Sequence, residues 1–281
     1  MRINMKITEN VHLIRKEFQV TPVVNRYVNV YLIEGQQGCY LIDSGVSGTE
    51  HLIDEYMKSI GKSMKDINGL FLTHSHPDHI GAASKIKQLS NCIIYAPEKE
   101  LSWIENIDNQ FRERPIPNFY GLLSESVEVD TPIEDGMTFK LEEGMEIKCI
   151  STSGHSHGSM SFLLNGDVIF IGDAIPVVND IPIFVDYKAT ISTIEKLSEI
   201  EGISYYCPAW DDVYDARNFQ VTTTASLQML EKLKEAAIEV NQNIDATDES
   251  DNVRMILEKA ELLQFAGNPL VVKSIEACCV E

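Results

Sequence analysis

The sequence predicts an α/β fold in which two sheets pack together and helices cover their outer faces. Short runs of β-branched and aromatic residues alternate with segments whose apolar residues recur at helical spacing. The same alternation occurs in the first half of the chain and again in the second. With 281 residues, the chain can bury the core of one large domain and carry a small appendage.

The first half contains five runs typical of strands and two segments typical of helices. Residues 35–38 include Gly35 and Gly38 and supply a turn between two of the strands, which predicts a hairpin. Gly61 ends the first helical segment. The expected strands are 11–14, 28–33, 39–42, 70–73 and 91–95, and the expected helices are 49–60 and 80–89.

The second half repeats this pattern. Asn165, Gly166 and Asp167 form a strong turn signal between two apolar runs. The expected strands are 137–139, 145–151, 161–164, 168–171 and 203–207, with one helix over 189–200. We find no short repeat and no low-complexity tract.

Two segments differ from this alternation. Residues 106–132 contain three prolines and several aromatic residues, which indicates a long loop that is either a lid or a packed surface excursion. From residue 218 the pattern becomes helical, with helices over 226–240 and 252–265 and a polar linker over 241–251. We therefore divide the chain into a domain at 1–217 and a helical extension at 218–281. The extension packs either on the core or on a second subunit, which leaves a homo-oligomer open.

The charge balance restricts the partners. The chain has 23 Lys and Arg against 43 Asp and Glu, a formal net charge of −20. Nucleic-acid binding depends on cations that neutralise phosphates, so we expect no nucleic-acid partner. The balance favours a small-molecule substrate, and it does not exclude an anionic one because bound divalent cations dominate their local field.

The apolar pattern predicts no membrane partner and a cytoplasmic location. No apolar stretch reaches 18 residues, and the first ten residues lack the apolar centre of a secretory signal. None of the six cysteines forms a C-x-x-C pair, and most lie in apolar runs. Buried, reduced thiols are the simpler interpretation.

A histidine run follows the expected strand at 70–73. His74, His76, Asp78 and His79 lie within six residues. Imidazole and carboxylate groups suit zinc, iron or manganese, and residues at i and i+2 of an extended segment project to the same side. A polar turn with accidental histidines is the alternative, but three of the seven histidines of the chain are in this run.

The run has the form H-x-H-x-D-H with Gly81 two residues further on. It resembles the signature of the metallo-β-lactamase fold superfamily. The runs 29–33 and 41–45 are similar to the opening hairpin of that family, and the resemblance covers residues 7 to 217. It implies a four-layer αββα sandwich, here with a C-terminal helical appendage, and a site for one or two metal ions at a sheet edge.

The resemblance also implies further ligands. The loop 152–159 is similar to the family's T-x-G-H-T-x-G-S loop, which implies His155 as a ligand of the first metal with His74 and His76. The run 169–173 is similar to the strand that ends in a bridging aspartate, which implies that Asp173 joins the two sites. Asp78 and His79 would then serve the second metal.

Three other histidines fall outside this ligand set. His157 stands where the family often has proline, and a solvated loop histidine is its better interpretation. His12 and His51 lie outside every motif and should be structural.

The last ligand of the family pattern is missing. Trp210 occupies the position where the family places a histidine, and no histidine follows His157. Asp211 or Asp212 could substitute as an oxygen donor for a harder ion. Alternatively, the second site is weak or empty and Trp210 lines the pocket, or Trp210 is simply a core aromatic residue.

These features imply a metal-dependent hydrolase that holds one or two Zn²⁺ ions, with iron or manganese as alternatives. A metal-bound hydroxide would attack an ester, thioester, lactone or related small-molecule bond. Asp78 could orient the water or shuttle a proton. The alternatives are a mononuclear iron oxidoreductase of the persulfide dioxygenase type, built from His74, His155 and Asp173, and a non-catalytic module with a degraded second site, motivated by Trp210.

Overall fold

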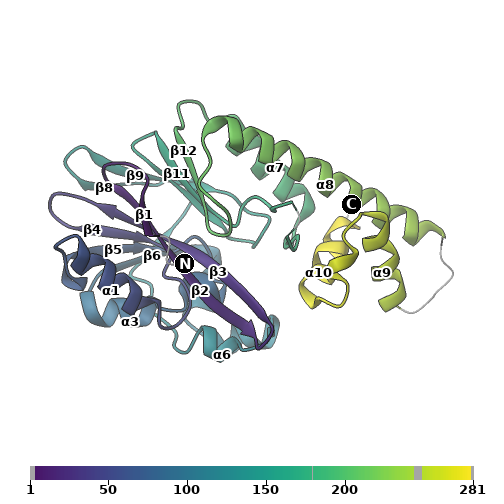
Figure 1. The fold of residues 1–281 in the computed structure, drawn as a ribbon, viewed down its shortest axis with the longest axis horizontal. Helices are drawn as coiled ribbons and strands as arrows, with labels where there is room; N and C mark the ends of the chain where they lie inside the picture. The colour runs from purple at the N-terminus through teal and green to yellow at the C-terminus, as the bar shows by residue number, and fades with distance from the viewer. Residues whose placement is uncertain (1–3, 179, 244–248, 280–281) are drawn as a thin grey trace.

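The computed structural model describes residues 4–178, 180–243 and 249–279. Two sheets face each other, and helices cover the outer face of each (Figure 1). The first sheet has the strand order β1-β2-β3-β4-β5-β6-β7, and the second has the order β12-β11-β10-β9-β8. The predicted αββα sandwich is therefore confirmed.

The first sheet changes from antiparallel to parallel pairing at its centre. Strands β1 to β4 pair antiparallel, whereas β4 to β7 pair parallel. The strands are β1 (Asn4–Lys6), β2 (Val11–Thr21), β3 (Val24–Glu34), β4 (Cys39–Ile42), β5 (Ile67–Phe71), β6 (Ile93–Pro97) and β7 (Thr131–Ile133).

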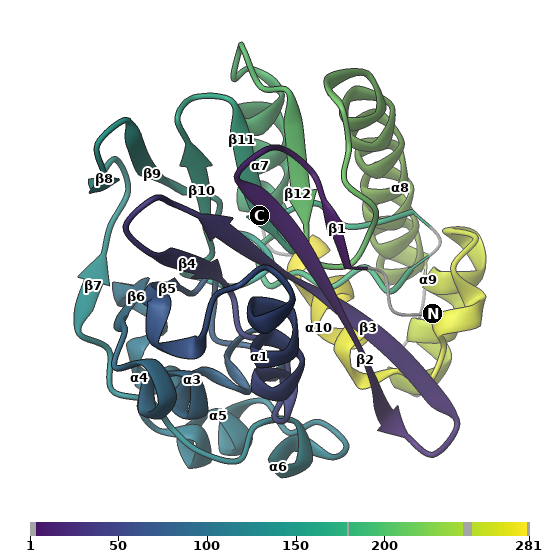
Figure 2. The ribbon, with the colours of Figure 1, turned by 60° about the vertical axis from the view of Figure 1, so that its left-hand side comes forward.

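The hairpin of β2 and β3 is longer than the sequence indicated. The first four residues of β2 are buried, but its second half is half-buried or exposed. Apolar runs reveal only the part of a strand that lies on the core, so the projecting part of this hairpin gave no signal. It extends from the sandwich toward the C-terminal helices (Figure 2).

The second sheet consists of β8 (Thr138–Glu142), β9 (Met145–Ser151), β10 (Met160–Leu164), β11 (Val168–Gly172) and β12 (Tyr205–Pro208). Helices α1 (Thr49–Ser59) and α3 (Ala83–Ser90) cover the first sheet, and α7 (Tyr187–Ser198) and α8 (Ala216–Asn243) cover the second. The space between the sheets is filled by residues such as Phe71, Phe162 and Phe170. Each apolar layer thus lies between two elements, as a sandwich requires.

The segment 106–132 is not a long irregular loop. It folds into α5 (Ile107–Glu113) and α6 (Phe119–Leu122), follows α4 (Leu101–Ile104), and ends in β7. Phe119 and Leu122 are buried, so the segment packs on the core. The sequence did not reveal these helices because each is too short to show helical periodicity.

The C-terminal extension packs on the second sheet rather than standing apart. Helices α8, α9 (Glu249–Lys259) and α10 (Pro269–Cys278) share one apolar cluster with β11 and α7. Helix α8 is longer than expected, α9 is shorter, and α10 was not expected at all. Residues 244–248 of the expected linker lie outside the described residues. The boundary at residue 217 stays a prediction.

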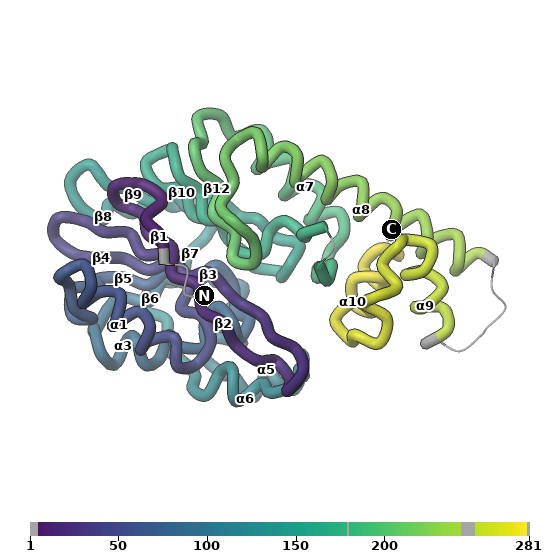
Figure 3. The backbone as a smooth tube through the Cα atoms, in the orientation of Figure 1, coloured from purple at the N-terminus to yellow at the C-terminus, as the bar shows by residue number. Residues whose placement is uncertain are grey.

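The long helix α8 runs along one side of the molecule, and α9 and α10 return from its far end (Figure 3). The turn between α9 and α10 includes the short helix η3 (Leu263–Phe265). No helix in the described part of the chain is both long and apolar enough to pass through a bilayer.

Candidate metal centre

The histidine run lies at the carboxyl end of β5, between the two sheets. After Phe71 the chain leaves the strand, and Pro77 begins the short helix α2 (Pro77–Ile80). Gly81 then lets α2 approach its neighbours, because a Cβ there would lie 2.3 Å from the carbonyl oxygen of Leu122. This glycine of the signature is thus required for packing at the site.

Four predicted ligands converge at one point. The ligand atoms of His74, His76, His155 and Asp173 all lie within 4.8 Å of one another. His76 Nδ1 is 3.0 Å from His74 Nε2 and 2.9 Å from His155 Nε2. Nitrogen ligands about 2.0–2.1 Å from a tetrahedral ion lie roughly 3.3–3.4 Å apart, so this spacing is close to that of a zinc site.

Hydrogen bonds fix the orientation of two of these imidazoles. His155 Nδ1 lies 2.9 Å from the carbonyl oxygen of Ile183, which can only accept, so Nδ1 carries the proton. His74 Nδ1 contacts Thr73 Oγ1 at 3.0 Å, and that hydroxyl donates to Asp43 Oδ2 at 2.8 Å. Both Nε2 atoms are therefore left with a lone pair directed at the site.

A second group shares Asp173 and adds Asp78 and His79. His79 Nδ1 donates to Asp43 Oδ2 at 2.8 Å, and His79 Nε2 lies 3.3 Å from Asp173 Oδ2 and 3.6 Å from Asp78 Oδ2. Of the buried polar atoms in the described residues, His79 Nε2 and Asp173 Oδ1 are among the few without a hydrogen bond. Buried polar atoms usually have a partner, so a bound cation would account for both.

Asp43 lies behind the histidines and holds them by hydrogen bonds, and no motif in the sequence singled it out. Its carboxylate accepts from Thr73 N, Thr73 Oγ1 and His79 Nδ1. Its backbone has φ 60°, a conformation that aspartate tolerates better than most residues. Asp43 thus orients one imidazole of each donor group. Its sequence signals were its place just after the expected strand 39–42 and within the family-like run 41–45, neither of which indicated this role.

Glu100 joins the two loops that carry the histidines. It accepts from Ser75 Oγ in the first loop, and from Ser156 Oγ and Gly158 N, each at 2.7 Å, in the second. Glu100 is 5% exposed, so these bonds replace those that water would make to its carboxylate. Nothing in the sequence distinguished Glu100 from the many surface glutamates.

Burial and the neighbouring charges prepare the site for a cation. Burial, together with the other cationic groups nearby, holds the pKa values of His74 and His76 well below the ordinary value. Burial also opposes charge on His79, but the carboxylates of Asp173, Asp43 and Asp78 outweigh it and raise the pKa of His79 well above normal. The pKa of Asp173 is lowered because His79 and His155 outweigh its burial. The second group therefore attracts positive charge.

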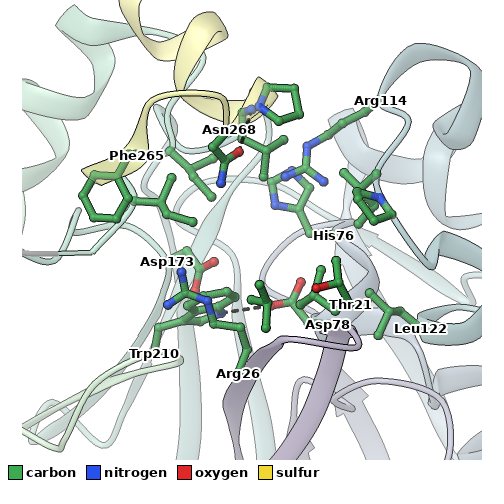
Figure 4. Close-up of a pocket in the computed structure, with 18 of the residues that line it drawn as sticks. Thr21, Arg26, His76, Asp78, Arg114, Leu122, Asp173, Trp210, Phe265 and Asn268 are labelled. Atoms are coloured by element: carbon green, nitrogen blue, oxygen red, sulfur yellow. Dashed lines mark hydrogen bonds between the residues drawn. The ribbon is translucent and has the colours of Figure 1, made fainter. Parts of the chain in front are cut away.

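Trp210 lies at the edge of the second group, and its indole Nε1 donates to Asp78 Oδ2 at 2.9 Å (Figure 4). An indole N–H cannot bind a metal. The structure does not support Asp211 or Asp212 as a substitute: Asp211 accepts from Tyr214 Oη at 2.5 Å, and Asp212 pairs with Arg15 at 2.9 Å. Trp210 does line the pocket, as one of the alternatives expected.

A cavity of about 520 Å³ opens onto both donor groups. Its walls are mostly apolar. They come from the tip of the β2–β3 hairpin, residues 114–122, residues 181–183, and residues 264–270 of the C-terminal extension. Phe265 and Asn268 face the site from the extension (Figure 4). The extension is thus part of the pocket, which its sequence did not indicate.

The remaining histidines stand apart from the donor groups of the described residues. His157 is exposed, as expected for a loop residue. His12 is buried and contacts Tyr56 Oη at 2.8 Å and Glu34 at 3.2 Å, and His51 is an exposed residue of α1.

Two known proteins are similar to this chain in sequence. It is 28% identical over 199 residues to a probable metallo-hydrolase of Methanocaldococcus jannaschii, covering 68% of this chain and 91% of the relative. It is 31% identical over 123 residues to a probable polyketide biosynthesis zinc-dependent hydrolase of Bacillus velezensis, covering 44% of this chain and 45% of the relative.

A solved structure and a family model agree with these relatives. A metallo-beta-lactamase family protein of Thermus thermophilus superimposes with a TM-score of 0.73 at 16% identity, over 96% of this chain and 94% of that protein. The match therefore reaches into the C-terminal extension. The model of the metallo-beta-lactamase superfamily matches residues 23–238. This chain belongs to the metallo-beta-lactamase superfamily.

Proposed function

We propose that the protein is a metal-dependent hydrolase of a small-molecule ester, thioester or lactone. The observation that carries the proposal is the convergence of four donor side chains at the inner end of a cavity of about 520 Å³. A donor set without a pocket would suggest a structural ion, because structural sites are closed. Here the donors face a space large enough for a substrate.

The residues of the first group would hold the ion. His74, His76 and His155 supply neutral imidazole nitrogens, and Asp173 supplies an oxygen. A bound divalent ion contributes Lewis acidity and lowers the pKa of water to about 7. The hydrogen bonds of Thr73, Ile183 and Glu100 keep the ligands in place without rearrangement, which is the protein's own contribution to such a site.

Asp78 is the residue we propose for proton transfer. Burial, with the nearby charge of Asp173, raises its pKa in spite of the opposing effect of His79. Its Oδ2 already accepts from the indole of Trp210, which fixes the carboxylate at the cavity wall. A carboxylate so held can accept a proton from the attacking water and return it to the leaving group.

We also propose that the first group binds its ion more tightly than the second. The first group has four donors, whereas the second has Asp78, His79 and the shared Asp173. Zinc is the ion we favour, because three imidazoles and one carboxylate suit it and a relative is described as a zinc-dependent hydrolase.

The test combines metal content with turnover. Protein purified without chelators is analysed for metal per chain, then assayed on a panel of esters, thioesters and lactones before and after chelation. One or two zinc or manganese ions with chelator-sensitive hydrolysis would support the proposal. Bound iron with oxygen uptake would instead favour the dioxygenase-type oxidoreductase, and no turnover after metal is restored would favour a non-catalytic module.

A further inference from the structure

Arg114 is a buried cation at the metal centre that the hydrolytic mechanism above does not use. The residue is 9% exposed, and its side chain makes no hydrogen bond or ion pair within the described residues, although it lines the cavity of about 520 Å³. Buried guanidinium groups normally bind a carboxylate or phosphate in a forked arrangement. An unpaired one that faces a cavity is therefore available to a ligand.

The local sequence explains why helix α5 ends before Arg114, and a tertiary contact then holds this segment at the site. Helix α5 ends at Glu113, and Pro115 disfavours a helical conformation at Arg114. The backbone there is no longer helical, with φ −138° and ψ 71°. Gln110, one turn earlier, donates to the carbonyl oxygen of Ser75 at 2.6 Å and anchors α5 to the ligand loop. Figure 4 shows the guanidinium of Arg114 reaching toward His76.

The nearby carboxylates do not satisfy this cation. Burial lowers the pKa of Arg114 to about 10, against the opposing effect of Asp78, Asp173 and Glu100, so the side chain is charged at neutral pH. None of the three lies within ion-pair distance in the described structure. Glu100 is occupied by Ser75, Ser156 and Gly158, and the two aspartates belong to the donor groups.

A second cavity begins at Arg114 and shares part of the lining of the first cavity. It has a volume of about 360 Å³ and shares His76, His155 and Arg114 with the first cavity. Lys99 and Lys273 also line it. Its lining carboxylates are engaged, since Glu113 accepts from Trp103 Nε1 at 2.7 Å and Glu100 is bonded as described. In a chain of net charge −20, this concentration of cations is selective for an anion.

We propose that the substrate has two arms, an apolar acyl arm in the first cavity and an anionic leaving group in the second, and that Arg114 binds the anion. This inference rests on the proposed hydrolase function. For a thioester, water adds to the carbonyl carbon, the C–S bond breaks, and the thiolate takes up the proton released by the water. Arg114 is then a specificity-determining residue, with Lys99 and Lys273 supplying further positive charge.

The first test is hydrolysis of two thioesters that differ in one charge. Hexanoyl 3-mercaptopropionate carries a carboxylate on its leaving thiol, and the hexanoyl thioester of methyl 3-mercaptopropionate is its neutral match. We expect the protein to prefer the anionic thioester in kcat/KM, mainly through KM. Arg114→Gln should lose about tenfold to a hundredfold of that preference, as expected for a charge-assisted hydrogen bond.

Arg112→Gln is the matched control, because Arg112 carries the same charge two residues earlier, on helix α5, but is exposed. It should leave the preference unchanged. Arg114→Lys, which keeps the charge without the fork, should show an intermediate preference and replaces Arg114→Gln if that variant does not fold. Equal preference in the wild type and in both Arg114 variants would overturn the proposal.

The second test needs no turnover. Binding of hexane-1-sulfonate, a poor metal ligand, is measured by calorimetry on the metal-loaded protein against neutral hexan-1-ol. Arg114→Gln should bind the sulfonate at least about tenfold more weakly, and Arg112→Gln should not. If no thioester is hydrolysed but this difference persists, the anion site stands and the hydrolase function fails. If the sulfonate binds both variants equally, the anion site fails.

Discussion

The two donor groups of the metal centre share Asp173 but differ in completeness. The first brings three imidazoles and a carboxylate together, with hydrogen bonds that fix the orientation of His74 and His155. The second has one imidazole and two carboxylates, and one of these accepts from the indole of Trp210. A single aromatic residue at the edge of the site thus separates a four-donor group from a three-donor group.

In this metal centre, the hydrogen bonds that orient a ligand and the number of donor side chains are separate properties. Asp43 contacts His79 of the second group directly, and it supports His74 of the first group through Thr73. The second group therefore keeps its orienting hydrogen bond although it lacks a fourth donor. We infer that it can bind an ion weakly, and the variants below test this difference.

Removing a ligand of the first group should have the largest effect. His76→Ala deletes the imidazole that lies 3.0 Å from His74 Nε2 and 2.9 Å from His155 Nε2. We expect turnover to fall by more than about a hundredfold and most bound metal to be lost, because even losing an outer-shell partner costs ten- to hundredfold. Metal per chain and kcat/KM measure this, and circular dichroism should show an intact fold.

His51→Ala is the control for that variant, because His51 is an exposed residue of α1 that belongs to neither donor group and lines neither cavity. It should keep both metal and turnover. Full activity in His76→Ala would exclude the first group as the catalytic centre.

Giving the second donor group a fourth donor should remove the difference in metal binding between the two groups. Trp210→His replaces an N–H that cannot ligate with an imidazole that can. We expect bound zinc to rise from near one toward two per chain at a fixed small excess of zinc. Trp210→Phe removes the hydrogen bond to Asp78 without adding a donor and should leave the stoichiometry unchanged. No increase with histidine would mean that something other than the missing ligand limits the second group.

Removing the charge of Asp43, which supports both donor groups, should lower their metal affinity moderately. Asp43→Asn keeps the shape of the side chain but removes the charge that His79 and Thr73 contact. We expect metal affinity, measured by chelator competition, to fall about tenfold to a hundredfold. Asp54→Asn on α1 removes a carboxylate that pairs only with Lys58 among the described residues, and it should have no effect. Equal affinities for both variants would contradict this role.

The smallest expected effect is the change with pH in the thermal stability of the metal-free protein. The pKa values of His74, His76 and His155 are lowered, so below about pH 6.5 the unfolded chain binds protons that the folded site resists. The melting temperature should therefore fall as the pH is lowered from about 7.5 to 5.5. Asp78 and His79, whose pKa values are raised, oppose this change, but they are two groups against the three histidines with lowered pKa values. A melting temperature that rises on acidification would show that the histidines are not buried together.

The histidine run shows how much of the site could be predicted from the sequence. His74, His76, Asp78 and His79 are neighbours in the chain, so the geometry of a strand end and one helical turn places them together. His155 and Asp173 could be selected because each lies within a family-like run, and the structure brings both to the same point. The alternation of apolar runs likewise predicted the two sheets and most of their strands.

Only the tertiary structure decided which segments that are distant in the chain contact one another. Glu100, Arg114 and the loop at 264–270 carry no local pattern, and their roles depend on which loops pack against them. The same holds for Trp210: the sequence established that a histidine is missing, but only the fold shows its indole on Asp78, with Asp211 and Asp212 turned elsewhere. Periodicity and short motifs record interactions within one element, whereas a pocket is formed by side chains from several.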